Sequence, residues 1–328
     1  MSTNVLISSA GRRVALLEAF RQTLAELHLQ GRVLATDASS CSAAAWVADE
    51  RFVVPRCTDQ GFVPRMLQLC EEQQVALLVP TIDTELMALA RHREAFRAVG
   101  TTVVVSSVET ISLAEDKRKT HAFLLEGGFP TVRQGEVADV LSDPGAWPFP
   151  LIAKPVGGSA SEGVVVVRDR EGLVAATAST DAVVQTLARG SEFTVDLFVD
   201  ATGACRGAVP RERLEVRAGE VVKARTARIG VIIELAEQLA KSLPEPFGVL
   251  NLQLFFEPAS GELRIIEINP RFGGGFPLAH QARAPFVRWL LELAADRTPD
   301  FESEPWQDGL MMLRYDEAVF VPRDQLSC

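Results

Sequence analysis

The sequence contains no long apolar run: no stretch approaches the roughly 18 consecutive apolar residues that a membrane-spanning helix needs. Residues 1–13 hold only a short apolar run before polar and basic residues, a pattern that does not predict a signal peptide. Internal repeats and low-complexity tracts are also missing. We therefore expect a cytoplasmic protein that does not associate with membranes.

Paired cysteine motifs are absent as well. The five cysteines form no CxxC motif, and their spacing matches no zinc-binding pattern. An odd number of scattered cysteines is typical of reduced thiols in a cytosolic protein. The cysteines are Cys41, Cys57, Cys70, Cys205 and Cys328.

Basic residues are fewer than acidic ones in this chain. The chain has 33 Lys and Arg against 43 Asp and Glu, and its net charge is -10. Because nucleic acids and anionic membranes are bound by clustered Lys and Arg, we expect neither as a partner. The chain is 47% hydrophobic and 23% charged, which is typical of a folded globular protein rather than a disordered one. Its 328 residues are enough for two or three domains.

Two common nucleotide-binding motifs are missing. The P-loop pattern GxxxxGK[ST] does not occur. The turn after the first expected strand, residues 8–13, has one glycine where the dinucleotide fingerprint has three. Asp37 ends the second strand, where a ribose-binding acid would lie, but an Asp there also commonly caps a turn. We expect this region to line a cleft and to pack rather than to bind a dinucleotide.

Strands and helices alternate in the first third of the chain. Continuous apolar strands that alternate with helices predict a parallel sheet covered on both faces. Residues 1–112 are therefore expected to form an α/β, Rossmann-like doubly wound domain. The expected strands are 5–7, 33–36, 52–55, 76–80 and 103–105, and the expected helices are 12–29, 62–73 and 85–96.

A glycine-rich loop follows in the middle of the chain, between expected strands at 151–155 and 164–167. Glycine lets backbone N–H groups approach an anion closely, and Lys154 would add a positive charge beside the same phosphates. The loop could instead be a merely flexible hairpin connection. Its glycines and serines are Gly157, Gly158, Ser159, Ser161 and Gly163.

The remaining pattern is α+β, with antiparallel strands and one long amphipathic helix at 231–243. The last two strands carry polar residues on one face. Glu267 and Asn269 are two residues apart, so they share a strand face, and Gln253 on the partner strand can join them. Such oxygen donors suit Mg2+, and Arg271 could reach a phosphate beside the metal. The expected strands are 182–187, 193–200, 203–211, 220–225, 249–256 and 263–269.

The order and spacing of these motifs resemble the ATP-grasp superfamily, and most closely its carbamoyl-phosphate-synthase large-subunit-like members, from about residue 8 to residue 295. The resemblance implies a pre-ATP-grasp domain at 1–112 and a two-lobed ATP-grasp domain at 113–300. Its lid lobe would span about 120–188 and its metal-binding lobe about 189–300. A C-terminal tail, 301–328, would carry two short strands at 311–315 and 318–321.

The resemblance also implies a binding site for ATP and Mg2+, with Mn2+ as a possible substitute. Lys117 and Lys154 would contact phosphates, and the loop 157–163 would close over them. Arg271 would meet the transferring phosphoryl group, and Arg271 and Lys154 would be the catalytic residues. The resemblance further assigns the adenine hinge to Gln185, Thr186 and Leu187, the ribose to Glu192, and the metal to Gln253, Glu267 and Asn269.

The activity implied is that of an ATP-dependent carboxylate–amine ligase, which forms an amide through an acyl phosphate and releases ADP and phosphate. The partners would be small-molecule carboxylates and amines, and a homo-oligomer remains open. One alternative is a bicarbonate-activating carboxylase or carbamoyl-phosphate-type enzyme. A non-catalytic nucleotide-binding regulator is a second alternative.

Several residues are candidates for substrate binding. Arg211 and Arg213 begin a basic segment, 211–228, that could bind phosphate or a carboxylate or could be a solvated hairpin with alternating charge. Gly274 lies in a glycine run after Arg271. His280 is either a polar pocket residue or a helix-capping bystander. Glu85 is either a cleft residue or an acid favoured by the dipole at a helix start.

Overall fold

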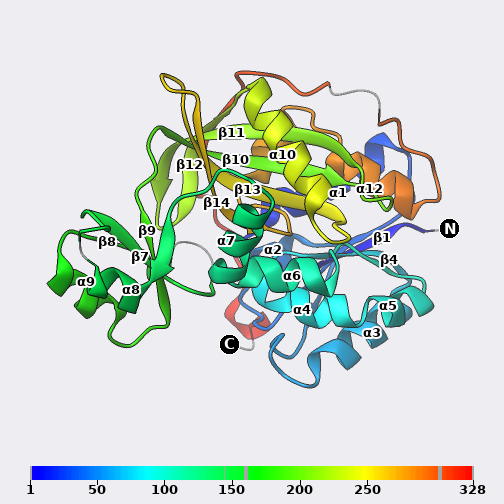
Figure 1. Ribbon diagram of the computed structural model, residues 1–328. Coiled ribbons are helices and arrows are strands. Elements are labelled where there is room, and N and C mark those ends of the chain that lie inside the picture. The colour runs from blue at the N-terminus through cyan, green and yellow to red at the C-terminus, as the bar shows by residue number, and fades with distance from the viewer. Residues whose placement is uncertain (1, 144, 159–161, 302–304, 327–328) are drawn as a thin grey trace.

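The molecule contains one parallel and two antiparallel sheets, drawn as a ribbon in Figure 1. The computed structural model describes residues 2–143, 145–158, 162–301 and 305–326. Mixed α/β architecture, with a Rossmann-like sheet followed by two further lobes, confirms the expected fold class.

The first sheet is parallel, with the strand order β3-β2-β1-β4-β5. Its central strands, β1 and β4, have buried apolar middles because helices cover both faces. The chain leaves β1 toward β2 on one side and later returns to β4 on the other side. The strands are β1 Asn4–Ser8, β2 Val33–Asp37, β3 Glu50–Val53, β4 Val75–Pro80 and β5 Thr102–Val103. The helices are α1 Val14–Glu26, α2 Ala43–Val47, α3 Phe62–Glu72, α4 Asp83–Arg91, α5 Arg93–Ala98 and α6 Val108–Glu115.

Two expectations for this region are corrected. The single helix expected at 85–96 is two helices, because His92 has non-helical angles, φ -112° and ψ 13°. The third strand ends at Val53 rather than residue 55, because its pairing with β2 stops where β2 ends at Asp37.

The second sheet is antiparallel, with the order β14-β13-β10-β11-β12-β15. Helix α10, Gly230–Ser242, packs its apolar face on this sheet around Leu239 and Leu252, as its 3.6-residue periodicity predicts. The strands are β10 Ser191–Val199, β11 Cys205–Arg217, β12 Glu220–Thr226, β13 Gly248–Glu257, β14 Glu262–Asn269 and β15 Met311–Leu313. Helices α7 Lys117–Glu126, α11 Phe276–Gln281 and α12 Phe286–Ala294 flank it.

The third sheet is a small lobe, in green in Figure 1, that projects from the rest of the molecule. Its order is β6-β9-β7-β8, and α8 and α9 cover one face around Trp147 and Leu151. The other face of the sheet carries Lys154 and Gln185. The elements are β6 Gln134–Glu136, α8 Val137–Ser142, β7 Leu151–Pro155, β8 Val165–Val167, α9 Arg170–Thr177 and β9 Ala182–Thr186.

The C-terminal tail differs from expectation. Met311–Leu313 pairs with β12, but residues 318–321 form no strand, and a 3-10 turn, η1 Arg323–Gln325, follows them. Phe320, in this segment, is 92% exposed. Cys57, Cys70 and Cys205 take part in no disulfide, whereas Cys41 is disulfide-bonded. The expectation of reduced thiols is thus corrected for Cys41, which no sequence motif marked for pairing.

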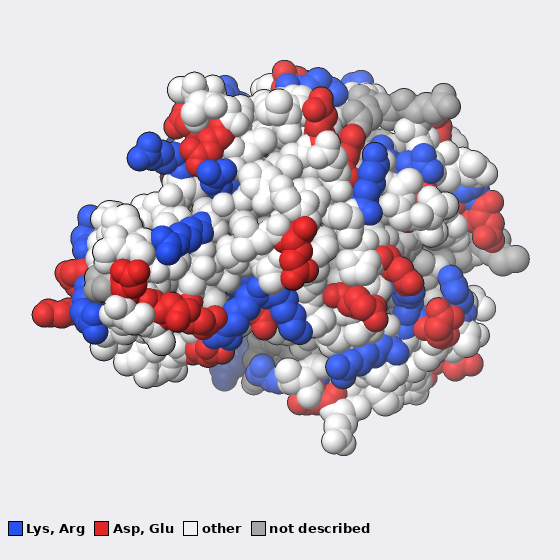
Figure 2. Space-filling model, in the orientation of Figure 1, with Lys and Arg blue, Asp and Glu red and all other residues white. Residues whose placement is uncertain are grey.

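Within the described ranges, no helix is both long and apolar enough to cross a membrane. Figure 2 shows Lys and Arg interspersed with Asp and Glu over the face in view.

An aromatic cluster joins α12 to the second sheet. Trp289 is 1% exposed and its ring lies 5.1 Å from Phe198, 5.7 Å from Phe286 and 5.2 Å from Phe301. Its indole nitrogen donates to the Asp300 carbonyl at 3.0 Å. The same apolar core continues to Leu17 and Phe20 on α1, so it also ties the parallel sheet to the rest of the chain.

We therefore expect Trp289→Ala to lower the free energy of unfolding by about 3–5 kcal/mol, because it opens a cavity in this shared core. Urea denaturation followed by circular dichroism measures the loss. Val174→Ala is the control, since Val174 is 48% exposed on α9. Equal stability of the two variants would contradict the assigned packing.

Candidate functional site

The hairpin of β13 and β14 carries a row of polar side chains on one face. Gln253 pairs directly with Glu267, and Asn251 pairs with Asn269. Cross-strand partners lie on the same face, so the expected placement of Gln253 beside Glu267 is met. Asn251 was not anticipated. Its side-chain amide donates to the carbonyl of Arg271 at 2.9 Å and thereby fixes the chain just after the strand.

Lys117 of α7 and Lys154 of the small lobe act on this row. Burial raises the pKa of Glu267, and Lys117 and Lys154 oppose that rise by their positive charge. The pKa of Lys154 is lowered to about 8, mainly by burial; the Glu267 carboxylate opposes this shift and Lys117 adds to it. The pKa of Lys117 is also lowered by burial, again with Glu267 opposing. The structure therefore brings together one acid and two partly desolvated amines from three distant segments.

The glycine-rich loop begins at this cluster. The Lys117 amine donates to the carbonyl of Gly158 at 3.1 Å and makes a longer contact, 3.5 Å, with that of Gly157. Gly163 ends the loop at φ +72°, where a Cβ would meet the Pro155 ring at 2.8 Å, so only glycine fits. Strands β7 and β8 pair as the predicted hairpin. Ser159 and Ser161 lie outside the described residues.

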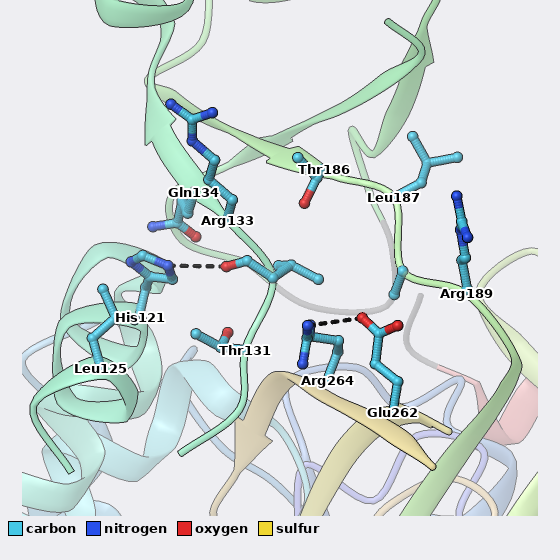
Figure 3. A pocket seen from close by; sticks show the side chains of 12 residues that line it. His121, Leu125, Thr131, Arg133, Gln134, Thr186, Leu187, Arg189, Glu262 and Arg264 are labelled. Carbon is cyan, nitrogen blue, oxygen red and sulfur yellow. Dashed lines mark hydrogen bonds and ion pairs between the residues drawn. The ribbon is translucent and has the colours of Figure 1, made fainter. Parts of the chain in front are cut away.

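A cavity of about 580 Å³ adjoins the hinge between the two lobes (Figure 3). Thr186 and Leu187 line it, together with His121 and Leu125 of α7 and Arg264 of β14. The third hinge residue, Gln185, is buried and donates from its side-chain amide to Gln134 at 2.6 Å. Lys117, Lys154 and Glu267 do not line this cavity, so it lies beside the charged cluster and is not its centre.

The two candidate arginines of β11 are both paired with acids. Arg213 lies 3.1 Å from Glu192, the expected ribose-binding acid, and so positions that carboxylate. Arg211 is 1% exposed and forms a bidentate pair with Asp196, at 2.6 Å from Nε and 3.0 Å from Nη2. At Arg211 and Arg213 the basic segment is therefore not a solvent-exposed hairpin of alternating charges. Farther along the segment, Glu215 and Lys223 do form an exposed ion pair.

The position of Arg211 also explains why residue 275, in the run after Arg271, is a glycine. A Cβ on Gly275 would lie 2.2 Å from Nη1 of Arg211, so a side chain there would displace the guanidinium. That same Nη1 is buried and has no hydrogen-bond partner in the described part of the chain.

Arg271 is held by a residue of the first domain. Its Nε and Nη2 donate to the two carboxylate oxygens of Asp83 at 2.9 and 2.6 Å. Asp83 is the first residue of α4, directly beyond the carboxyl end of β4. This bidentate pair joins the parallel sheet to the end of β14, and the sequence analysis did not anticipate it.

Glu85 is fully buried and accepts four hydrogen bonds. Ser8 and Ser9 donate to one oxygen at 2.5 and 2.9 Å, and the amides of Thr81 and Ile82 donate to the other at 2.8 and 3.3 Å. With both oxygens occupied, Glu85 ties together the turns after β1 and β4. Of the two alternatives for Glu85, the structure fits an acid with a local role at a helix start better than a residue that contacts a substrate.

His280 and Gly274 lie beside α1. Burial lowers the pKa of His280, and Glu26, the last residue of α1, opposes this shift, whereas Glu267 takes no part in it. Gly274 lies near Arg13, at the N-terminal end of that helix. A substrate role for His280 stays a prediction.

Residues 114–275 match the family model described as the ATP-grasp domain, and residues 5–104 match the PylC-like N-terminal domain. The chain carries an ATP-grasp domain. The ATP-grasp match spans the two lysines, the glycine-rich loop and the whole polar row.

Curated relatives of this ATP-grasp chain include the carbamoyl phosphate synthase large chain of Thermomicrobium roseum, 27% identical over 240 residues, which are 67% of this chain and 22% of the relative. The carbamoyl-phosphate synthase of Methanobrevibacter smithii is 23% identical, covering 69% of this chain and 64% of the relative. The chain thus spans about a fifth of the first of these proteins.

Solved structures share the fold of the ATP-grasp chain. An L-amino acid ligase from Bacillus licheniformis has a TM-score of 0.71 at 19% identity, covering 93% of this chain and 77% of its own. The biotin carboxylase domain of 2-oxoglutarate carboxylase from Hydrogenobacter thermophilus, solved with MgADP and bicarbonate, has a TM-score of 0.73 at 18% identity. That match covers 95% of this chain and 73% of the other.

The donor set on the hairpin fits a magnesium ion that phosphates help to hold. Gln253, Glu267 and Asn269 offer oxygen donors on one strand face, the chemistry that Mg2+ prefers. Elsewhere in the described chain, no three His, Cys, Asp or Glu side chains gather into a metal site. With a single carboxylate here, most of the charge that balances the ion would come from the nucleotide.

The Arg211–Asp196 pair leads to a stability prediction. We expect Arg211→Met to lower the free energy of unfolding by about 3–5 kcal/mol, because it leaves a buried carboxylate unpaired. The double variant Arg211→Met/Asp196→Leu should recover much of that loss, since no buried charge remains. Guanidinium denaturation measures both, and an unchanged midpoint for the single variant would show that the pair has no such role.

Proposed function

We propose that the chain is an ATP-dependent carboxylate–amine ligase that works through an acyl phosphate and releases ADP and phosphate. The observation that carries the proposal is the meeting of Lys117 and Lys154 with Glu267 beside Arg271. Buried amines whose pKa is lowered by burial regain stability as cations when an anion approaches. A triphosphate supplies such an anion, and Glu267 lies where a metal would join it.

Each part of the site has a task in this proposal. Lys117 and Lys154 neutralise the phosphates. The loop with Gly157, Gly158, Ser159, Ser161 and Gly163 covers them. The hinge, Gln185, Thr186 and Leu187, lies along the adenine, and Glu192, held by Arg213, binds the ribose hydroxyls.

Gln253, Glu267 and Asn269 would hold Mg2+, or Mn2+ in its place. When bound, the ion neutralises charge on the β- and γ-phosphates. The chain's own contribution is to fix the three oxygen donors on a paired hairpin, where neither strand can move alone.

The reaction has two steps. A carboxylate oxygen of the substrate attacks the γ-phosphorus, the bond to the bridging oxygen breaks, and ADP leaves. An amine then attacks the acyl carbon, the carbon–oxygen bond breaks, and phosphate leaves as the amine loses a proton. The protein positions the reactants and neutralises charge, so no side chain need act as a nucleophile.

Arg271 would stabilise the phosphoryl group during transfer, because its planar fork matches phosphoryl oxygens. In the structure the fork is closed on Asp83, so Arg271 must release at least one of these bonds to bind substrate. Asp83 thus keeps the guanidinium oriented until an anion takes its place.

A bicarbonate-activating enzyme is the second candidate. It is favoured by the carboxylase domain solved with bicarbonate, whose fold this chain shares. The substrates would in either case be small molecules, and we expect the enzyme to act in the cytoplasm without nucleic acid or membrane partners. A homo-oligomer remains compatible with the proposal.

Removing the arginine tests the proposed role. We expect Arg271→Ala to bind Mg-ATP but to form ADP at least about a hundredfold more slowly, the usual cost of losing one stabiliser of a developing charge. Arg97→Ala is the control, since Arg97 is an exposed partner of Glu94. Coupled ADP assays and calorimetric titration with Mg-ATP separate turnover from binding. ADP formation at the wild-type rate in Arg271→Ala would reject this role.

The intermediate can be trapped. With the right carboxylate and no amine, hydroxylamine should convert the acyl phosphate to a hydroxamate, and ¹⁸O from the carboxylate should appear in the released phosphate. A screen of amino acids and other carboxylates for ADP release finds that substrate. Release of AMP and pyrophosphate would point to an adenylating enzyme, and hydroxamate or ADP formation with bicarbonate alone would favour the second candidate.

A further inference from the structure

The carboxyl ends of β1 and β4 lie side by side at the switch point of the parallel sheet. The chain continues from β1 toward β2 and reaches β4 and then β5 on the opposite side. In open α/β sheets, ligands bind outside the carboxyl ends of the strands at such a switch point. Residues 9–13 follow β1 here, and residues 81–83 follow β4.

Arg13 lies at this switch point without an acid of its own. Its Nη2 donates one long hydrogen bond, 3.4 Å, to the carbonyl of Thr81. Among the residues that the structure describes, no carboxylate lies within ion-pair distance of its guanidinium. The pKa of Arg13 is lowered to about 10, mainly by burial and also by the charge of Arg271, although Glu220 opposes the shift. The side chain is therefore a half-buried cation whose charge is not matched locally.

The neighbours of Arg13 leave that charge uncompensated. Two further arginines act on it, Arg271 and Arg314, and each acid nearby is already bonded. Asp83 is held by Arg271, and Glu220 binds Arg314 at 2.7 Å while also pairing with the exposed Arg12. Helix α1, which starts beside Arg13, has no side-chain cap and no acid in its first turn, so its dipole adds positive potential.

Gly274 lies against the guanidinium of Arg13. A Cβ there would lie 3.0 Å from Nη1 of Arg13, so glycine leaves the guanidinium room. The Gly274 carbonyl accepts a bond from Arg314 at 2.6 Å, which fixes the loop against the second arginine. Arg13 thus meets residues of the first domain, the glycine run and the tail at one place.

Arg271 links Arg13 to the proposed nucleotide site. The charges of Arg271 and Asp83 shift the pKa of both Glu267 and Arg13, whereas those of Lys117 and Lys154 shift the pKa of Glu267 and not that of Arg13. In the proposed reaction, Arg13 therefore neighbours the residue that meets the transferring phosphoryl group and not the two lysines that meet the other phosphates.

We infer that Arg13, with Arg314 and Gly274, binds an acidic group of a substrate that is separate from the carboxylate being activated. The inference rests on the proposed ligase function. An activated carboxylate loses its own charge when it becomes an acyl phosphate, a mixed anhydride, whereas a second acidic group stays charged throughout and can hold the molecule in place. The preferred substrate is therefore an acid with two anionic groups, or an amine that carries one.

The test compares matched pairs of probes on the full chain. Three- to six-carbon dicarboxylic acids are compared with their monoamides, which keep the length and lose one charge, with hydroxylamine as the amine in an ADP-release assay. We expect kcat/KM to favour the diacid about tenfold or more, as for a hydrogen bond to a charged group. A second set of assays pairs each active acid with an amino acid or with the corresponding amino acid amide as the amine. A preference for the free amino acid would show that the acidic group belongs to the amine substrate.

Arg13→Met should abolish the preference mainly by raising KM, and Arg13→Lys should keep part of it. Gly274→Ala, which crowds the guanidinium, should weaken it too. Arg12→Met removes the same charge from the adjacent exposed residue and should leave the preference intact. Thermal unfolding with each diacid, without ATP, reports binding even in variants that do not turn over.

The outcomes separate the two proposals. Diacids that raise the unfolding temperature only when Arg13 is present, without any ADP release, would support the Arg13 site and reject the ligase. Equal rates of ADP release with each acid and its amide, in both sets of assays, would reject the Arg13 site but not the ligase. A preference for the diacid over its monoamide that survives Arg13→Met also overturns the inference. The same holds if Arg12→Met abolishes that preference to the same extent, or if the diacids show neither binding nor turnover.

Discussion

The register between β13 and β14 determines the polar row of the candidate site. Gln253 opposite Glu267 and Asn251 opposite Asn269 place the polar donors on one face and leave Ile265 and Ile268 in the core. A slip by one residue would turn every side chain of β14 to the other face and bury the carboxylate among leucines. Because the apolar residues must stay inside, the same force that builds the core also aims the donors.

The charged groups beside that face offset one another. Burial works against the charged form of Lys117, Lys154 and Glu267; the lysines oppose the pKa shift of Glu267, and Glu267 opposes that of each lysine, whereas Lys117 adds to that of Lys154. The row is held in place by backbone pairing and by Asn251, not by these charges. If a nucleotide binds here as proposed, charge can be redistributed without disturbing the strands.

Local patterns predicted most of the fold. Apolar strands alternating with helices identified the parallel sheet, and the two-residue spacing of Glu267 and Asn269 placed them on one strand face. Contacts between distant segments were out of reach. Asp83 meets Arg271 across 188 residues, and nothing around either residue marks the pair. For the same reason Arg211 resembled a free cation in the sequence, although Asp196 on the next strand holds it. Ser159 and Ser161 remain predictions.

Asp83 and Arg13 come from the first domain, yet Asp83 is paired with Arg271, which follows the polar row, and the charge of Arg271 acts on Arg13. Under the proposed function, the seam between the two units would thus be part of the site rather than a simple joint. A chimera that exchanged the first hundred residues with those of a related protein would then exchange side chains of that site along with the scaffold. In such a lineage, choice of substrate would be inherited with the domain that has no nucleotide motif of its own.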